Sequence, residues 1–141
     1  MCDYNSLFKA ELDTIAGIGY TPQKTLNDFL NDLVQHSIIR KDSMYIDKQC
    51  HFIVGQLAVW CKETHAIDIQ ESYALFTRKN ADYGNAFELC GRVGILIRLL
   101  DKIQRCIHLE SKPDTDTIHY ESIKDTYTDL FNYTILYRIV Q

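Results

Sequence analysis

Apolar residues recur along this chain at the spacing of an amphipathic helix, and strand-like alternation is weak throughout. The clearest stretch places apolar side chains at positions i, i+3, i+4, i+7, i+8 and i+12, namely Leu26, Phe29, Leu30, Leu33, Val34 and Ile38. Thr21 is suited to cap this helix, and Pro22 fits its first turn. The pattern predicts an all-α fold, a single-domain bundle of about five to six helices with mostly antiparallel neighbours.

The same periodicity gives approximate bounds for the helices. They are predicted over residues 5–16, 22–38, 45–62, 68–79 and 91–109, with a last helix from about 117 to 140. Gly84 is expected to end the fourth helix in a left-handed conformation, and a short extended piece near 38–46 is the open alternative. The expected inward residues are Phe8, Leu12 and Ile15 in the first helix, Ile46, Cys50, Ile53, Leu57 and Cys61 in the third, Ile69, Tyr73 and Phe76 in the fourth, and Val93, Leu96, Leu100, Ile103 and Ile107 in the fifth.

Composition narrows the class of protein. The 141 residues suffice for one domain with a hydrophobic core, and 2 Pro and 6 Gly argue against a disordered or linker-rich chain. A formal net charge of −4 makes direct nucleic-acid binding an unfavoured function. The five cysteines form no CxxC motif, which is typical of buried free thiols in a reducing compartment. With no signal-peptide pattern and no long apolar run, we expect an intracellular protein that does not enter a membrane.

The last predicted helix carries an acidic stripe. Glu121, Asp125, Asp129 and Asn132 fall within about 80° of arc at 3.6 residues per turn. Three carboxylates stacked one turn apart repel each other and weaken an isolated helix. A positive partner is therefore expected, either a basic neighbouring helix or a bound divalent cation such as Mg²⁺, which takes oxygen ligands.

Two further polar clusters supply groups that bind phosphate. Arg98, Lys102 and Arg105 lie within about 60° of arc, opposite the predicted apolar face of the fifth helix. The end of the fourth helix presents Lys79, Asn80, Asp82 and Tyr83. Mg²⁺ on the acidic stripe, beside a basic clamp, would be the arrangement that cleavage at a phosphate needs.

Structural readings of these clusters stay open. The basic row also fits a solvated helix face, with Asp101 and Arg105 as a surface pair spaced i, i+4. The acids on the last helix also fit a set of ion pairs that fixes the register of two helices without any ligand. Cys61 and His65 are spaced i, i+4, but zinc needs four ligands, so buried thiols and surface histidines are the favoured reading. The chain contains neither GxxxxGK[ST] nor GxGxxG.

Three ordered segments make the sequence resemble the first nucleotide-modification-associated domain family of phages and large DNA viruses. They are KNADYG at 79–84, RLLDKIQR at 98–105 and ESIKDTYTDLFNY at 121–133. The resemblance covers about half of the chain. It assigns residues 67–141 to a nucleotide-modification-associated helical core and leaves 1–66 as an added helical portion of the same compact domain. The acidic helix is also similar, more distantly, to the all-α nucleoside triphosphate pyrophosphatases, although its acids are spaced i, i+4, i+8 and no ExxE lies on a partner helix.

The resemblance implies a protein of viral nucleotide or DNA-modification metabolism, in the host cytoplasm or a virus factory. Lys79, Asn80, Asp82, Tyr83, Arg98, Lys102, Arg105 and Asn132 would bind a nucleotide or nucleotide-derived phosphate. Glu121, Asp125 and Asp129 would hold Mg²⁺ and carry catalysis if the protein is a pyrophosphohydrolase. The alternatives are a non-catalytic sponge for a nucleotide signal, and a regulatory or interaction module with a structural charge network. A homodimer with a site between subunits is a further expectation.

Overall fold

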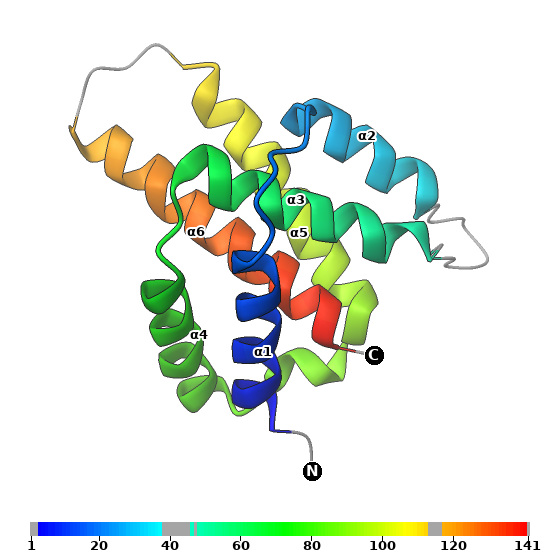
Figure 1. The fold of residues 1–141 in the computed structure, drawn as a ribbon, viewed down its shortest axis with the longest axis vertical. Coiled ribbons are helices and arrows are strands. Elements are labelled where there is room, and N and C mark those ends of the chain that lie inside the picture. The colour runs from blue at the N-terminus through cyan, green and yellow to red at the C-terminus, as the bar shows by residue number, and fades with distance from the viewer. Residues whose placement is uncertain (1–2, 38–45, 47, 113–116, 141) are drawn as a thin grey trace.

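A computed structural model describes residues 3–37, 46, 48–112 and 117–140, and of Tyr83 and residues 117–122 the backbone alone. Six α-helices and one short 3₁₀ helix form a single all-α bundle (Figure 1). They are α1 (Tyr4–Ala16), α2 (Leu26–His36), α3 (Gln49–His65), α4 (Ile69–Tyr83), η1 (Ala86–Leu89), α5 (Gly91–Glu110) and α6 (Thr117–Ile139). The predicted fold class is confirmed, and the described ranges contain no strand. Most of residues 38–46, where an extended piece was the alternative, lie outside them.

The start of α2 differs from the prediction. Thr25, not Thr21, caps the helix: its hydroxyl accepts from the Asp28 N–H at 3.2 Å, and the Asp28 carboxylate accepts from the Thr25 N–H at 2.8 Å. Hydrogen bonding of the carboxylate to the Thr25 backbone N–H, followed by bonding to the Thr25 side chain, holds the pKa of Asp28 below its usual value. Pro22 is instead buried in the connection that precedes the helix.

Lys62 of α3 holds the start of the connection between α1 and α2. Its ammonium donates to the carbonyl oxygens of Ile15, Ala16 and Ile18 at 3.1, 3.2 and 2.7 Å. These oxygens belong to the end of α1 and the following residues, where backbone acceptors lack helical partners. The charged group thus fixes the path of the connection, and α2 begins only after it.

Helices α3 and α6 lie at the centre of the bundle. α6 packs against α3, α5, α1 and α4, while α3 also packs against α1 and α2. α3 is therefore buried on several sides, through Cys50, Ile53, Val54, Leu57, Ala58, Val59 and Cys61. The described residues before position 67 therefore share one hydrophobic core with the rest of the described chain.

Two predicted apolar faces needed adjustment. Val34 of α2, predicted to point inward, is 52% exposed. On α5, two of the five residues predicted to point inward, Leu96 and Ile103, are buried. The other three are only partly buried: Val93, Leu100 and Ile107. The remaining buried residues of α5 are Ile95, Leu99 and Cys106, which were not predicted. α5 contacts both α6 and α2, so its buried stripe is shifted from the one expected for a single neighbour. This shift turns part of the basic row toward α6.

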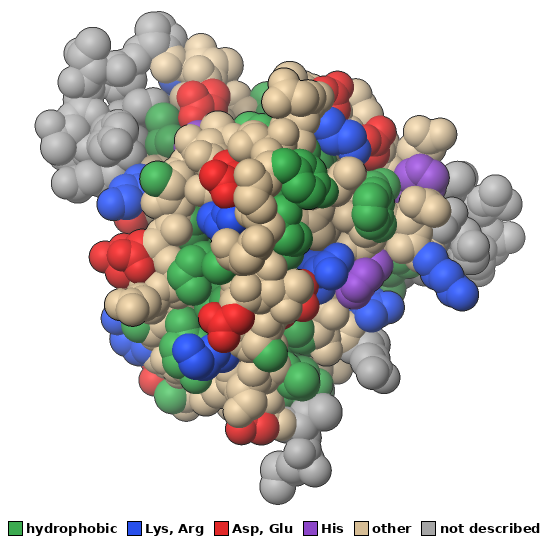
Figure 2. All heavy atoms as spheres, viewed as in Figure 1, with side chains coloured by type: hydrophobic (Ala, Val, Ile, Leu, Met, Phe, Trp, Pro, Cys, Tyr) green, Lys and Arg blue, Asp and Glu red, His purple; other side chains and the backbone are tan. Residues whose placement is uncertain are grey.

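The predicted free thiols are confirmed among the described cysteines. Cys50, Cys61 and Cys106 are buried, and Cys90 is exposed. Burial raises the pKa of Cys106 to about 12 and that of Cys61 well above its usual value. Charged side chains of both signs are interspersed on the face shown in Figure 2. No described helix combines the length and the apolar character that crossing a membrane requires.

Candidate functional site

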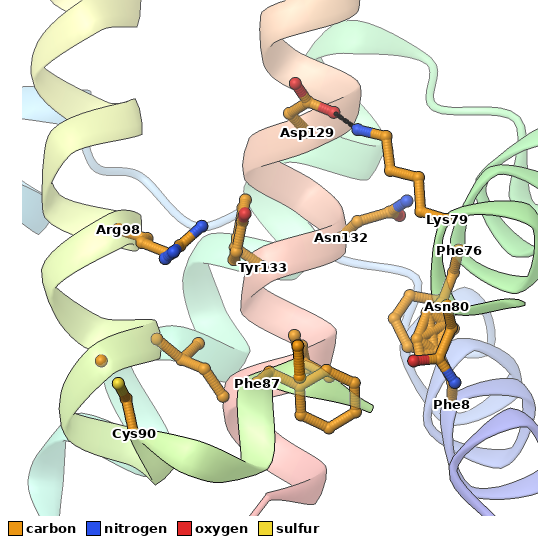
Figure 3. Close-up of a pocket in the computed structure, with 14 residues that line it drawn as sticks. Phe8, Phe76, Lys79, Asn80, Phe87, Cys90, Arg98, Asp129, Asn132 and Tyr133 are labelled. Carbon is orange, nitrogen blue, oxygen red and sulfur yellow. Dashed lines mark hydrogen bonds and ion pairs between the residues drawn. The ribbon is translucent and has the colours of Figure 1, made fainter. Parts of the chain in front are cut away.

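A cavity of about 450 Å³ opens between α4, η1, α5 and α6, with α1 at its base (Figure 3). Its lining combines aromatic and aliphatic side chains with a few polar ones. The lining residues are Phe8, Phe76, Lys79, Asn80, Ala86, Phe87, Cys90, Gly94, Ile95, Arg98, Asp129, Asn132, Tyr133 and Leu136. A cavity of this size with few polar groups is typical of a small-molecule site.

Aromatic rings form the apolar part of the cavity. Phe8 of α1 stacks on Phe76 of α4, with ring centroids 3.9 Å apart and an interplanar angle of 12°. The ring centroid of Phe87 in η1 lies 4.9 Å from that of Tyr4, in an edge-to-face arrangement, and 6.3 Å from that of Phe76. Each ring is thus supported by another, which limits its freedom to collapse into the cavity.

Asp129 of α6 lies between two lysines from different helices. The Lys79 ammonium of α4 is 3.3 Å from one carboxylate oxygen, and the Lys102 ammonium of α5 is 3.6 Å from the other. Lys102 also lies 6.0 Å from the centroid of the Tyr133 ring. The predicted meeting of the acidic stripe with the basic row therefore occurs at Asp129, and it links three helices.

Arg98 supplies positive charge that the pocket does not neutralise. It extends from α5 toward Tyr133 in Figure 3. Within the described ranges, no carboxylate or carbonyl lies within ion-pair or hydrogen-bond distance of its guanidinium. Arg105, two turns further along α5, is exposed and is not part of the cavity lining. The predicted clamp is thus divided: Arg98 lines the cavity, Lys102 holds Asp129 and Arg105 lies apart.

Asn80 holds the turn that leads from α4 into η1. Its side-chain oxygen accepts from the Asn85 N–H at 3.0 Å, and its amide nitrogen donates to the Asn85 side-chain oxygen at 2.6 Å. Gly84 and Asn85 are both left-handed, with φ of 56° and 59°. The predicted role of Gly84 as the end of the fourth helix is confirmed. Positive φ is costly for Asn85, and the Asn80 amide offsets that cost.

Asn132 of α6 is bonded to α4. Its side-chain oxygen accepts from the Ser72 hydroxyl, and its amide nitrogen donates to the Ser72 carbonyl oxygen at 3.2 Å. Ser72 is fully buried. These two bonds fix the position of α4 against α6 near the cavity.

Most residues that line the cavity belong to a segment of the chain that matches one sequence family. Residues 79–140 match the family described as "Nucleotide modification associated domain 1". The predicted family is confirmed over this part of the chain, which is fewer than half of its 141 residues. The similarity to all-α nucleoside triphosphate pyrophosphatases stays a prediction. No curated protein and no solved structure matches the chain.

The segment that matches this family, residues 79–140, contains every site residue that the sequence predicted, but the structure brings only some of them together. Lys79, Asn80, Arg98, Asp129 and Asn132 line the cavity, and Lys102 reaches Asp129. Asp82 and Asp125 are exposed and outside the lining. The side chains of Tyr83 and Glu121 lie outside the described part of the structure.

The predicted magnesium site stays a prediction. Among the side chains that the structure describes, no group of three or more His, Cys, Asp or Glu could hold a metal ion. Glu121 is not among them, so the predicted set of Glu121, Asp125 and Asp129 is incomplete there. Both carboxylate oxygens of Asp129 face lysine ammonium groups, which is the surrounding of a neutralised acid rather than of an oxygen ligand waiting for a cation.

Several lining residues were missed at the level of sequence. Tyr133 ends the third quoted segment, so its place beside Asn132 offered a signal. Phe87 and Cys90 follow the predicted helix end closely, yet nothing in their spacing points to a cavity. Phe8 lies outside the matching segment, 71 positions before Lys79, and only its contact with Phe76 brings it to the site.

Proposed function

We propose that the cavity binds a nucleotide or a nucleotide-derived phosphate, in the nucleotide or DNA-modification metabolism of a virus. The observation that supports this most directly is the unneutralised Arg98 guanidinium at an aromatic cavity of about 450 Å³. Arginine binds phosphate oxygens in a bidentate manner, and aromatic rings stack on bases. The description of the matching family points to the same class of ligand.

The charges around the cavity favour an anion. Lys79 and Arg98 line the cavity together with one carboxylate, Asp129, and Lys102 reaches that carboxylate from outside the lining. A phosphate at Arg98 would be able to draw one or both lysines away from Asp129, because both ion pairs are long. The apolar lining would exclude water from the ring of the ligand and strengthen these electrostatic contacts.

A magnesium-dependent pyrophosphohydrolase is the catalytic form of this proposal. Glu121, Asp125 and Asp129 would hold the ion, which would supply Lewis-acid activation of a phosphate and a water. The non-catalytic form is a sponge that retains the ligand unchanged. An assay for released pyrophosphate separates the two, because turnover is expected only from the enzyme.

Two α5 variants test the proposal. Arg98→Gln should weaken binding of a nucleoside triphosphate by roughly 10- to 100-fold, because a charge-assisted hydrogen bond contributes about 1.5–3 kcal/mol. Arg105→Gln removes an arginine that is also exposed but lies outside the cavity lining, and it should leave affinity within about twofold. Calorimetric titration, with and without Mg²⁺, measures both. Equal losses in the two variants, or no binding by any nucleotide tested, would refute the proposal.

A structural interaction module is the second candidate, and the Lys79–Asp129–Lys102 contacts favour it. One carboxylate that joins α4, α5 and α6 could serve only to fix three helices. This reading predicts no ligand and a large loss of stability when Asp129 is neutralised. The expected homodimer also stays a prediction, which sedimentation of the purified chain would test.

A further inference from the structure

We infer that the cavity selects its ligand by phosphate and by the flat face of a ring, and that it accepts different bases with similar affinity. This inference rests on the proposed function and specifies the ligand class of the same cavity. It comes from an asymmetry in the lining: both amide side chains are hydrogen-bonded within the protein, whereas Arg98 is not bonded to any described residue.

Asn80 cannot turn its amide toward the edge of a base without giving up its two bonds to Asn85. Its oxygen and its nitrogen both bond Asn85, whose backbone N–H has no helical partner in this left-handed turn. Turning the amide toward a ligand would leave that N–H unpaired and release a turn with positive φ. The residue therefore shapes the cavity instead of discriminating among bases.

Asn132 is committed in the same way. Its two polar atoms bond the hydroxyl and the carbonyl oxygen of Ser72, which is 0% exposed. Reorienting this amide would leave two buried groups of Ser72 short of a partner, and such groups are costly to leave unsatisfied. Bidentate recognition of a base edge by Asn132 is thus disfavoured.

The rest of the lining consists mainly of aromatic rings and aliphatic side chains, which contact the flat face of a base and not the polar atoms along its edge. Apart from the ionic groups and the thiol of Cys90, the polar side chain of the cavity that has no hydrogen bond to a described residue is Tyr133. Phe87 and Tyr133 present rings, and Ile95 and Leu136 present aliphatic surface. Stacking on a ring tolerates any base, since every base has a π-face. A site that hydrogen-bonds the edge of its ligand discriminates far more strongly.

Calorimetric titration with ATP, GTP, CTP and UTP tests the inference directly. We expect the four dissociation constants to fall within about tenfold, with purines tighter than pyrimidines because they stack more strongly. Adenosine should bind at least about 100-fold more weakly than ATP, because it carries no charge for Arg98. Inorganic triphosphate should bind roughly tenfold more weakly than ATP, because it cannot stack.

The outcomes separate the two claims. If one base binds more than about 30-fold tighter than the other three, the inference is wrong while the proposed function stands. If none of the triphosphates binds, both fail. If adenosine binds as tightly as ATP, selection by phosphate fails, and a nucleoside site replaces it.

Variants of Tyr133 provide a second test that does not depend on the ligand panel alone. Tyr133→Phe keeps the ring and removes the hydroxyl, and it should leave all four affinities within about twofold. Tyr133→Leu keeps apolar volume but removes the ring, and it should weaken all four by a similar factor of about tenfold. A change in the ranking of bases with Tyr133→Phe would show that the hydroxyl reads the base and would overturn the inference. Thermal melting of both variants confirms that they fold.

Discussion

Two charged clusters of this bundle use the same kinds of side chain in different ways. At one end of α6, Arg138 meets Glu11 of α1 at 2.5 Å and donates to the His51 carbonyl oxygen of α3 at 2.7 Å. Nearer the middle of α6, Asp129 meets Lys79 and Lys102 at 3.3 and 3.6 Å. The ion pair of the first cluster is short and is joined by a hydrogen bond to a backbone carbonyl, whereas the second cluster has longer ion pairs and two cations on one carboxylate.

Burial sharpens the difference. The side chains of Arg138 and Glu11 are 19% and 17% exposed, and Gly55 leaves the room that the guanidinium occupies: a Cβ there would lie 2.5 Å from an Arg138 nitrogen. Lys79, in contrast, is 54% exposed. A buried arginine that binds in a fixed geometry stabilises the fold, whereas an exposed lysine at long distance is readily exchanged. The comparison indicates that the Arg138 cluster is structural and that the Asp129 cluster is available to a ligand.

The largest expected effect comes from breaking the Arg138 cluster. Arg138→Met should lower the free energy of unfolding by about 3 kcal/mol, because it leaves Glu11 mostly buried without its partner. Lys79→Met is the matched control and should cost less than about 1 kcal/mol, as exposed ion pairs do. Urea denaturation measures both. Similar losses in the two variants would contradict the distinction between the clusters.

A smaller effect is expected at the Asp129 cluster, where a substitution should strengthen ligand binding and leave stability almost unchanged. Asp129→Asn removes the carboxylate that competes with a phosphate for Lys79 and Lys102. Affinity for a nucleoside triphosphate should rise about fivefold, or roughly 1 kcal/mol, with little change in stability. Asp125→Asn, one turn away on α6 and outside the cavity lining, is the control and should change affinity by less than about twofold.

The same pair of variants separates the readings of the acidic stripe. If Asp125 and Asp129 hold Mg²⁺, both substitutions should weaken metal-dependent binding. If Asp129 serves only to fix the helices, Asp129→Asn should lower the melting temperature strongly and no ligand should bind. Tighter binding of triphosphate to Asp129→Asn with an unchanged melting temperature is expected only from the non-catalytic form of the proposed function.

Sequence periodicity predicted the helices well where local signals were unique. Gly84 marked the end of α4 because its left-handed conformation is a local property. The start of α2 was predicted at Thr21, whereas Thr25 caps the helix, and the spacing of residues does not show the tertiary contact of Lys62 with the end of α1 that precedes it. The face of α5 was shifted because two helices cover it.

The site was predictable to the same extent. Charged positions at helical spacing placed Arg98, Lys102 and Asp129 near one another, since repulsion among acids requires a positive neighbour. The roles of Asn80 and Asn132 were not predictable. The sequence does not show whether an asparagine amide bonds another residue, as these two bond Asn85 and Ser72, or binds a ligand. Phe8 reaches the cavity through tertiary packing alone.

The smallest expected effect is a pH dependence of the Arg138 cluster. The His51 ring lies near this cluster, and burial, followed by the charges of Arg138 and Arg92, holds its pKa below the usual value, with Glu11 acting in the opposite direction. Its Nδ1 is buried and has no hydrogen-bond partner among the described residues. Because the unfolded chain binds the proton more readily, the contribution of His51 to stability is complete above the unfolded pKa of about 6.5 and declines as the pH falls below it.

Urea denaturation between pH 7.5 and 5.5 should therefore show falling stability for the wild-type chain. His51→Gln should flatten part of this decline, and the remainder should include His65, whose pKa burial also lowers. Arg138→Met should flatten it as well, because it removes one of the charges that oppose protonation of His51. Lys79→Met, at the other cluster, should leave the pH dependence unchanged. A slope that is the same in His51→Gln and wild type would show that His51 gains its proton as easily in the folded chain, and that the Arg138 cluster is more open to solvent than its burial indicates.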